Sequence, residues 1–138
     1  MRRLLIALLA AGVAVSAAGC NLSAVASTTA PHDAPTIRFQ LPAPDATFRE
    51  GEEVEILLVA QDEGAGVARV ELLVDDLPHQ QGEPVVSEAV PVFTVTMNWL
   101  AQGIGLHAFS AIAFRADGTA SEPAYLRILV TPPDPDSP

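Results

Sequence analysis

The sequence is poor in cysteine, lysine and aromatic residues, and each shortage excludes something. Cys20 is the only cysteine among 138 residues, so no disulfide can form within the chain. Lysine is absent, and 17 acidic residues outnumber 7 arginines. Because contacts to phosphate require lysine and arginine, we expect no nucleic-acid partner. Aromatic residues make up only 5% of the chain, which leaves few rings for a sugar-binding platform.

A long hydrophobic run is also missing. Residues 4–15 are almost wholly apolar, but a dozen residues fall short of the ~20 that a membrane-spanning helix needs. Arg2 and Arg3 precede this stretch, and the small residues 16–19 follow it. This three-part layout is typical of an export signal. We therefore expect residues 1–19 to be a signal peptide that is removed.

The end of this segment, Ala17-Ala18-Gly19-Cys20, resembles the lipobox of bacterial lipoproteins. In that family the cysteine thiol carries diacylglycerol, and the peptidase cuts just before the cysteine. The new amino group is usually acylated, with palmitate as the expected chain. The resemblance implies a lipidated Cys20 and a membrane-anchored protein on the cell surface or facing the periplasm. The family prefers leucine where this chain has Ala17. Ordinary secretion, with cleavage near Ala18, is the alternative.

Without the signal peptide the chain has the size and charge of one acidic domain. Arg2 and Arg3 are lost, so 7 − 2 = 5 arginines face 17 acidic residues and the net charge is about −12. Residues 20–35 are small, polar and aperiodic after the cysteine, which predicts a flexible linker with an r.m.s. span of roughly 20 Å. The tail, 132–138, is rich in proline and aspartate, and we expect it to be extended.

From residue 36 onward, apolar and polar residues alternate with a period of two. Val54, Ile56 and Leu58 alternate with Glu53 and Glu55, for example. Such alternation is typical of strands with one buried face, and no stretch sustains a helical period. We predict seven strands, at 36–41, 53–61, 67–75, 84–89, 92–99, 105–115 and 123–131.

Turn signals separate these strands and indicate the fold class. Asp, Gly and Pro cluster between them, as in 62–66, 75–78 and 117–119. Pro84 and Pro91 bracket the fourth strand, which suits a sheet edge. Seven short strands in 36–131 predict an all-β, antiparallel two-sheet sandwich with Trp99 in its core.

The same region resembles the bacterial Ig-like domains of exported and surface proteins. The stretches that carry this resemblance are Ala34-Pro35-Thr36-Ile37, residues 41–48, Gly51-Glu52-Glu53-Val54, residues 60–75, Gly105-Leu106-His107-Ala108-Phe109 and residues 113–121. The resemblance implies an Ig-like β-sandwich over residues 36–131. Members serve as adhesion modules, spacers, or carbohydrate- and protein-binding units, and the fold alone decides none of these.

Three positions depart from the pattern of that family. Arg115 and Thr119 stand where the family usually has Asp and Asn, and Asp76 stands where it often has Gly. Asp62 and Asp117 could converge at one end of the sandwich as calcium ligands. Arg115 disfavours a cation there, and turn capping by both aspartates is the alternative that we prefer. Asp75 and Asp76 with His79 form a second conceivable cluster. We predict no metal site.

The sequence offers no catalytic set. Cys20 would be blocked by lipid. His32, His79 and His107 have no nucleophile or carboxylate at motif spacing. We therefore predict a non-enzymatic protein that needs no cofactor.

Outward-facing apolar residues are the remaining candidate for function. If residues 109, 111 and 113 point into the core, Ile112 and Phe114 point out. Leu73 and Leu129 share this parity on strands that we expect beside them. An exposed apolar patch marks an interface, although scattered surface apolar residues are common. The predicted interface therefore consists of Leu73, Ile112, Phe114 and Leu129.

These observations lead to two functional hypotheses. The preferred one is a non-enzymatic cell-envelope lipoprotein, in which an Ig-like binding or structural module is tethered to a membrane by lipid. The alternative is a carbohydrate-binding surface module, for which only Phe48, Phe114 and Tyr125 remain as aromatic platforms. The expected partners are the membrane, through the lipid anchor, and a protein or glycan of the envelope.

Overall fold

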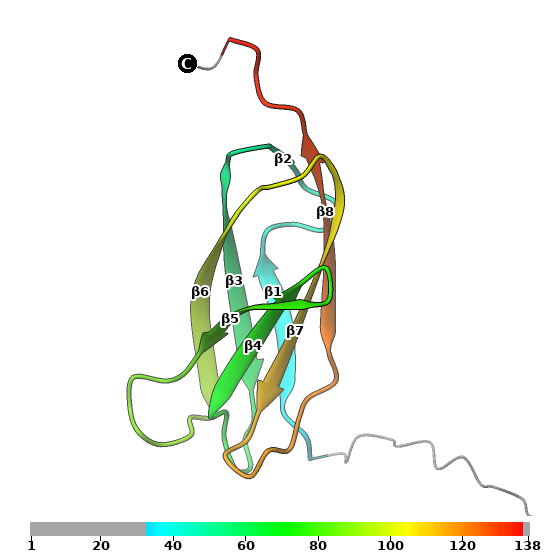
Figure 1. Cartoon of the computed structure of the whole chain (residues 1–138). Coiled ribbons are helices and arrows are strands. Elements are labelled where there is room, and N and C mark those ends of the chain that lie inside the picture. The colour runs from blue at the N-terminus through cyan, green and yellow to red at the C-terminus, as the bar shows by residue number, and fades with distance from the viewer. Residues whose placement is uncertain (1–32, 137–138) are drawn as a thin grey trace, which may run out of the picture.

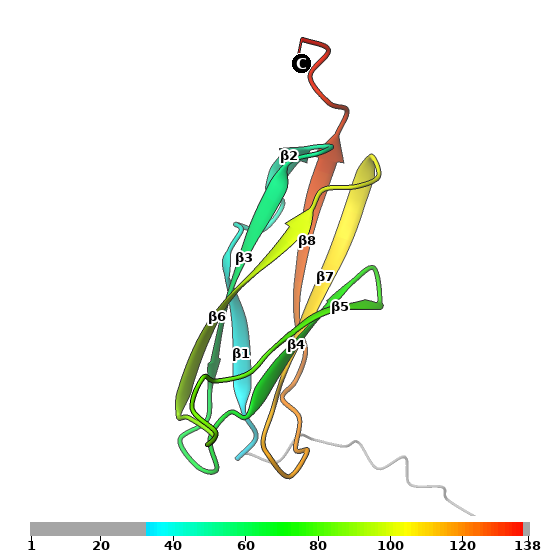
Figure 2. The same ribbon diagram turned by 60° about the vertical axis from the view of Figure 1, so that its left-hand side comes forward.

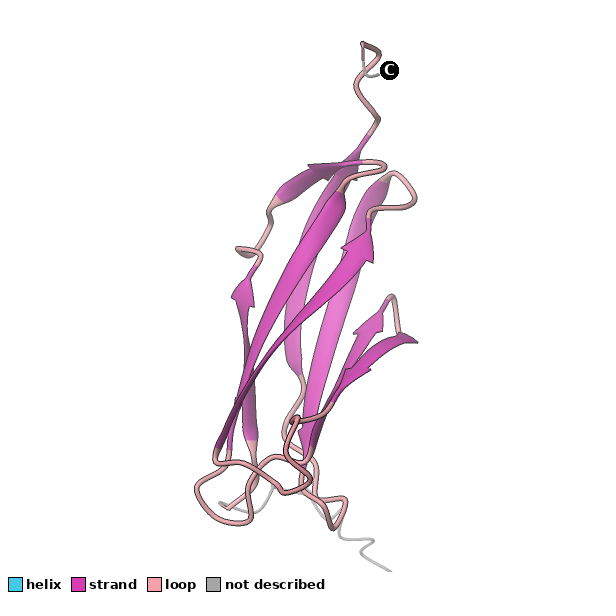
Figure 3. Cartoon of the chain, turned by 90° about the vertical axis from the view of Figure 1, so that its left-hand side faces the viewer, coloured by secondary structure: helices cyan, strands magenta, loops and turns pink. Residues whose placement is uncertain are grey.

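The computed structural model describes residues 33–136, which contain eight β-strands and no helix (Figures 1 and 3). The strands are β1 (Thr36–Leu41), β2 (Thr47–Arg49), β3 (Glu53–Gln61), β4 (Arg69–Val74), β5 (Leu77–Gly82), β6 (Val92–Leu100), β7 (Gly105–Phe114) and β8 (Ala124–Thr131).

The strands form two sheets that face each other (Figure 2). One sheet has three strands in the order β1-β3-β6, and the other has five in the order β2-β8-β7-β4-β5. All pairs are antiparallel except β2–β8, which is parallel. The predicted all-β, two-sheet sandwich is therefore confirmed.

The core lies between the sheets and follows the alternation in the sequence. On β3, Val54, Ile56 and Leu58 are fully buried, while Glu53 and Glu55 are exposed. Trp99 is also in the core, as predicted, with its ring 5.3 Å from that of Phe109 in an edge-to-face arrangement. Each such large apolar side chain contributes roughly 1.5–3 kcal/mol by leaving water. The other buried members are Ala60, Val67, Val70, Leu72, Val74, Met97, Ala101, Ala111, Ala113, Leu126, Ile128 and Val130.

The sequence prediction is wrong for one strand and misses two. Residues 84–89 make no strand, although Val85 and Val86 favour one; they lie in the loop between β5 and β6. The missing edge strand is β5, whose polar residues show no alternation, and nearly all of them are exposed. The other missed strand, β2, has only three residues, too few to show a period.

A tight turn joins β4 to β5 and sets the position of that edge. Asp75 and Asp76 have φ values of 51° and 65°, and Val74 pairs directly with Leu77. Two consecutive residues with positive φ between paired strands define the mirror-image turn that matches strand twist. The hairpin thus ends beside the start of β7, where the amide of Asp75 donates to the carbonyl of Ala108.

The chain enters and leaves the sandwich at opposite ends (Figure 1). We call the end holding Asp33 and the β3–β4, β5–β6 and β7–β8 loops the N-terminal pole. The opposite end, with the β2–β3 turn, the β6–β7 loop and the end of β8, is the distal pole, and the β4–β5 turn lies partway along the sandwich (Figures 1 and 3). Asp33 and Pro35 already contact the sandwich, since Pro35 is buried and Asp33 bonds Arg115.

Candidate functional site

The four predicted interface residues all lie on the outer face of the five-stranded sheet. Leu73 is on β4, Ile112 and Phe114 on β7, and Leu129 on β8, with β7 between the other two strands. The prediction that the strands carrying Leu73 and Leu129 lie beside the strand carrying Ile112 and Phe114 is therefore correct. Leu73, Ile112 and Phe114 are half-buried, whereas 38% of Leu129 is exposed.

Phe114 is not an open contact surface, because Arg69 covers it. The guanidinium of Arg69 lies 4.0 Å from the ring centroid, and its Nε is 3.0 Å from Oε1 of Glu71. A cation over an aromatic face is favourable in itself. The predicted patch is thus split, with a covered aromatic ring toward the N-terminal pole and Leu129 toward the distal pole.

Two more exposed residues on this face were not included in the predicted interface. Leu106 is 68% exposed and pairs directly with Leu129, and Tyr125 is 75% exposed opposite Ser110. Period-two parity carries the signal for both, since Leu106 shares the parity of Ile112 and Tyr125 that of Leu129. The outer face is therefore most exposed along β8 and at the start of β7.

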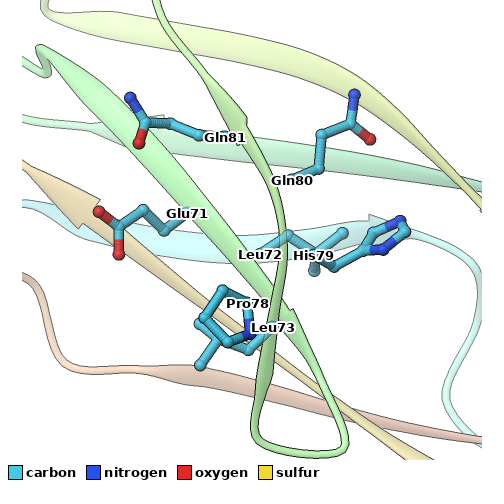
Figure 4. Close-up of a pocket in the computed structure, with 7 residues that line it drawn as sticks. All are labelled: Glu71, Leu72, Leu73, Pro78, His79, Gln80 and Gln81. Atoms are coloured by element: carbon cyan, nitrogen blue, oxygen red, sulfur yellow. The ribbon is translucent and has the colours of Figure 1, made fainter.

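A shallow depression of about 410 Å³ surrounds the edge strand β5 (Figure 4). Figure 4 shows Glu71 and Gln81 on one side of the β5 ribbon and His79 and Gln80 on the other. The register shift between Leu72 and Leu73 bends the pairing of β4 with β5 at this point. The depression is therefore a feature of a bulged sheet edge. Its lining is Glu71, Leu72, Leu73, Pro78, His79, Gln80 and Gln81.

The second conceivable metal cluster is not assembled. Nε2 of His79 bonds the carbonyl of Asn98 on β6, 2.9 Å away, and so ties β5 to the other sheet. Asp75 instead bonds His107. His79 and Asp75 thus serve separate contacts.

At the N-terminal pole, an arginine stands between the carboxylates that could have held calcium. Nε of Arg115 donates to Oδ2 of Asp62 at 2.5 Å, and Nη2 donates to Oδ1 at 3.0 Å. Nη2 also donates to the carbonyl of Asp33, whose Oδ1 lies 3.3 Å away. This bidentate pair is largely buried, with side-chain exposures of 10% for Arg115 and 3% for Asp62. The guanidinium therefore occupies the place of a cation.

Asp62 and Asp117 also cap turns, as the preferred alternative predicts. Oδ1 of Asp62 accepts from the amide of Gly64, and Oδ1 of Asp117 accepts from that of Thr119. The hydrogen bonds from Arg115 lower the pKa of Asp62 most, against the effect of burial. Within residues 33–136, no three His, Cys, Asp or Glu side chains gather closely enough to hold a metal.

At the distal pole, His107 joins two loops through both ring nitrogens. Nδ1 is 2.7 Å from Oδ2 of Asp75, and Nε2 is 2.7 Å from the carbonyl of Gly103. Both partners only accept, so both contacts are hydrogen bonds when the ring is protonated and both nitrogens donate. Burial alone would lower the pKa of His107, but the carbonyl of Gly103 and the carboxylate of Asp75 raise it overall.

Asp75 is held from two sides. Its Oδ1 accepts from the amide of Ala108 at 2.9 Å, and its Oδ2 faces His107. Burial would raise the pKa of Asp75, but the amide of Ala108 and the imidazolium lower it overall. The ring of His107 also lies 5.0 Å from that of Trp99. The pair therefore fixes the β4–β5 turn and the β6–β7 loop to the core.

The family model for the bacterial Ig domain matches residues 35–111, which is more than half of the sequence. The chain belongs to the bacterial Ig domain family. No curated protein matches it.

Solved structures show how widely this bacterial Ig domain shares its fold. A fibronectin(III)-like module of CbhA from Clostridium thermocellum is 22% identical, with a TM-score of 0.56, over 72% of this chain and 100% of that chain. The CARDB domain of a Pyrococcus furiosus protein, in complex with di-metal ions, is 14% identical with a TM-score of 0.55, over 75% of this chain and 99% of that chain. At these identities the likeness shows the fold.

The SrpA adhesin of Streptococcus sanguinis is similar too. It is 19% identical with a TM-score of 0.51, over 72% of this chain and 56% of that chain. The Ig-like sandwich predicted for residues 36–131 is therefore confirmed as a fold. The bacterial Ig domain therefore shares its fold with a fibronectin(III)-like module and a CARDB domain.

Several predicted features lie outside the residues that the structure describes. These are the signal peptide 1–19, the lipidated Cys20, His32 and the linker up to residue 32. Over residues 33–136, no helix is long and apolar enough to cross a membrane.

Proposed function

We propose that this chain is a non-enzymatic cell-envelope lipoprotein, in which a bacterial Ig domain is held at a membrane surface by lipid on Cys20. The observation that carries the proposal is the sequence Ala17-Ala18-Gly19-Cys20 after a short apolar stretch, with no other cysteine in the chain. Two or more acyl chains, at ~0.8 kcal/mol per buried methylene, give stable anchoring.

The position of Asp33 supports a tether at one end of the domain. Twelve residues, 21–32, separate Cys20 from Asp33, and their composition suits a flexible spacer. Arg115 bonds both the carbonyl and the carboxylate of Asp33, so a pull on the spacer acts on a fixed point of the N-terminal pole. The distal pole then faces away from the anchoring membrane.

His107 supports a non-enzymatic role. Asp75 and the carbonyl of Gly103 bind both of its ring nitrogens. A general base needs a free nitrogen within reach of a substrate, and His107 has none.

Replacing Cys20 tests the proposal. The Cys20→Ser chain, expressed in the bacterium from its own signal sequence, should move from the membrane fraction to the soluble fraction. Its thermal unfolding should match that of the unaltered chain purified in detergent, because Cys20 precedes the strands of the sandwich. Ser27→Ala, a change in the same spacer, is the matched control and should stay membrane-bound. A Cys20→Ser chain that still sediments with membranes would refute lipid anchoring.

Carbohydrate binding is the second candidate, and Tyr125 is the observation in its favour. The ring is 75% exposed on the outer face, opposite Ser110. Phe48 packs against the core and Phe114 lies under Arg69, so neither adds an open platform. A glycan array with the intact chain and with Tyr125→Ala decides the matter. Retained glycans that Tyr125→Ala releases would favour this candidate over protein binding.

A further inference from the structure

One of the four strands at a sheet edge lacks the features that keep such an edge from pairing. The edge strands are β1 and β6 in one sheet and β2 and β5 in the other. Short length, bulges, proline and charge normally prevent an edge from pairing with another chain. β2 has three residues, β5 contains Pro78 and a register shift, and β1 contains Arg38 and a register shift. β6 has nine residues, none of them charged or proline, and it pairs with β3 without a shift.

Hydrogen bonds at the two ends of β6 show which of its backbone groups point toward β3. The amide of Asp62 donates to the carbonyl of Pro91 at 2.8 Å, and the amide of Ala101 donates to the carbonyl of Glu52 at 2.8 Å. The backbone groups of an antiparallel strand alternate between its two sides. The odd-numbered residues from 91 to 101 therefore pair with β3, and the even-numbered residues turn their amides and carbonyls outward.

The carbonyl of Asn98 shows this outward direction, because it accepts from Nε2 of His79 on β5 rather than from β3. Val92, Thr94 and Thr96 share its backbone direction, and their side chains are exposed. Within residues 33–136, β3 is the only strand that pairs with β6, which runs along the left side of the sandwich in Figure 1. The backbone of Val92–Thr96 is therefore an open strand edge, which we call the β6 edge.

β5 approaches β6 from the inner side and leaves this edge open. A Cβ atom added to Gly82 on β5 would lie 2.8 Å from Cγ2 of Val95 and 3.1 Å from Cε of Met97. Val95 and Met97 are the side chains of β6 that point toward the core, since Met97 is 1% exposed and Val95 packs against the core cluster. β5 thus packs on the inward face of β6, not in the plane of its sheet.

Two carboxylates lie beside β6 on the outer face of the same sheet. Glu53 and Glu55 on β3 pair with residues 100 and 98 of β6, and both side chains are exposed. Neither takes part in an ion pair among residues 33–136. Arg38, the arginine of this face, pairs with Val59 near the other end of β3. The outer face next to β6 therefore carries negative charge without a bound cation.

We propose that the β6 edge binds an extended, basic segment of another protein, which adds to the three-stranded sheet as a fourth, antiparallel strand. Main-chain hydrogen bonds to Val92, Thr94 and Thr96 supply the affinity, as in other cases of strand addition. Arginine or lysine side chains on the outer face of the added strand extend across β6 toward Glu53 and Glu55, two strand spacings of about 4.8 Å away.

Charge selects this occupant over a second copy of the chain. The described residues carry a net charge of 5 − 17 = −12, so two copies side by side repel each other, whereas a basic segment is attracted. The proposal concerns the sandwich alone and does not depend on the lipid anchor.

Backbone-methylated peptides test the strand pairing. The protein is the Cys20→Ser chain in solution, the probe is a labelled synthetic peptide of alternating arginine and valine, and fluorescence anisotropy reports binding. In the antiparallel arrangement the arginine residues lie opposite Val92, Thr94 and Thr96 and form the hydrogen bonds with them. N-methylation of the arginine amides should therefore weaken binding by at least about tenfold, whereas N-methylation of the valine amides should leave it unchanged. Equal binding of the two methylated peptides would overturn the proposal.

Substitutions at Thr94 locate the binding surface. Thr94→Pro removes an outward amide at an edge position that tolerates proline, and it should weaken binding of the arginine–valine peptide by about tenfold or more. Thr94→Val keeps the amide and is the matched control, which should bind normally. Hydrogen exchange measured by NMR gives a readout on the chain with Thr94 intact, where the peptide should slow exchange of the Thr94 and Thr96 amides. Exchange rates that the peptide leaves unchanged at both amides would contradict pairing at this edge.

Charge variants test the chemistry of the partner. Glu53→Gln with Glu55→Gln should weaken binding of the arginine–valine peptide about three- to tenfold and reduce its dependence on salt. Glu63→Gln with Glu122→Gln makes the same change of net charge in loops at the N-terminal pole and should have little effect. Equal affinity of the two double variants would refute selection by Glu53 and Glu55.

Light scattering distinguishes the other occupant. A dimer of the Cys20→Ser chain that Thr94→Pro converts to a monomer would assign the β6 edge to a second copy instead. A monomer in both chains is the result that the proposal expects. All these measurements use the Cys20→Ser chain in solution, so their outcome is independent of the membrane fractionation that tests the anchor.

Discussion

At the scale of single residues, Arg115 joins segments of the described chain that are far apart in the sequence. It follows β7, yet it bonds Asp62 after β3 and Asp33 before β1. The Asp62 carboxylate is almost fully buried, so it depends on the guanidinium for its charge balance. Loss of the arginine alone should therefore cost more than loss of both members.

Substitution of the pair tests that dependence. Arg115→Met should lower the thermal midpoint by more than about 5 °C, since it leaves a buried carboxylate unpaired. Adding Asp62→Leu to Arg115→Met should raise the thermal midpoint part of the way back to that of the unaltered chain. Arg127→Gln, at an exposed position on β8, is the matched control. Differential scanning calorimetry gives the midpoints, and a double variant less stable than Arg115→Met would contradict this interpretation.

His107 predicts a dependence of stability on pH. Its pKa is raised above the ordinary value of 6.5, so its contribution is complete below that pH and is lost as pH rises through the folded pKa. The pKa of Asp75 is lowered from 3.8, so its contribution holds above that pH and is lost as pH falls. The stabilisation by the pair is therefore largest between these two values.

His107→Gln should thus be most destabilising, relative to the unaltered chain, near pH 5–6, and the difference should shrink toward pH 9. Thermal midpoints measured across that range supply the comparison. A direct NMR titration of the ring should also give a pKa above 6.5. His79→Gln serves as the control histidine. A His107 ring that titrates below 6.5, or a difference that does not vary with pH, would refute the imidazolium.

At the scale of elements, the β4–β5 turn is built from two aspartates in a conformation that favours glycine. Asp76 has φ of 65°, and it stands where related domains often have Gly. Asp76→Gly should therefore raise the free energy of unfolding by about 1 kcal/mol or less, by relief of backbone strain and of charge repulsion with Asp75. Urea unfolding measures the effect, with Asp76→Ala as the control that keeps the strain. A Gly variant less stable than the unaltered chain would contradict the turn assignment.

The strands could be predicted from the sequence where one face is buried and the other is exposed to solvent. β1 and β3 begin and end where the alternation does, because a buried face forces apolar residues onto every second position. β5 has no buried face, and its register comes from the aspartate turn and the pairing with β4. Such a strand shows no alternation in the sequence. The apolar pair Val85 and Val86 instead led to the prediction of a strand at 84–89, which is a loop.

The sequence predicted which residues of the candidate surface face outward, but it did not predict which of them are covered by other side chains. Leu129 and Ile112 lie on the predicted face, but the position of Arg69 over Phe114 depends on cross-strand pairing, which alternation does not report. The pairing of Arg115 with Asp62 joins residues 53 positions apart and needs the fold itself.

At the scale of the whole molecule, the negative charge of the domain and the position of its N-terminal end both agree with the proposed anchor. The described residues carry all 17 acidic residues and 5 of the 7 arginines, a net charge of 5 − 17 = −12. An anionic membrane surface would repel such a domain, which suits a sandwich held off the surface by a spacer. Asp33 bonds Arg115 at the N-terminal pole, so in the proposed arrangement the distal pole faces away from the membrane.

Intact-mass spectrometry of the chain extracted from bacterial membranes tests the proposed anchor most directly. The account predicts a mature chain that starts at Cys20 and carries the added mass of a diacylglycerol thioether and an amide-linked acyl chain. The Cys20→Ser chain should lack both additions. A chain from the membrane fraction that starts at another residue, or that keeps a free thiol at Cys20, would contradict the account.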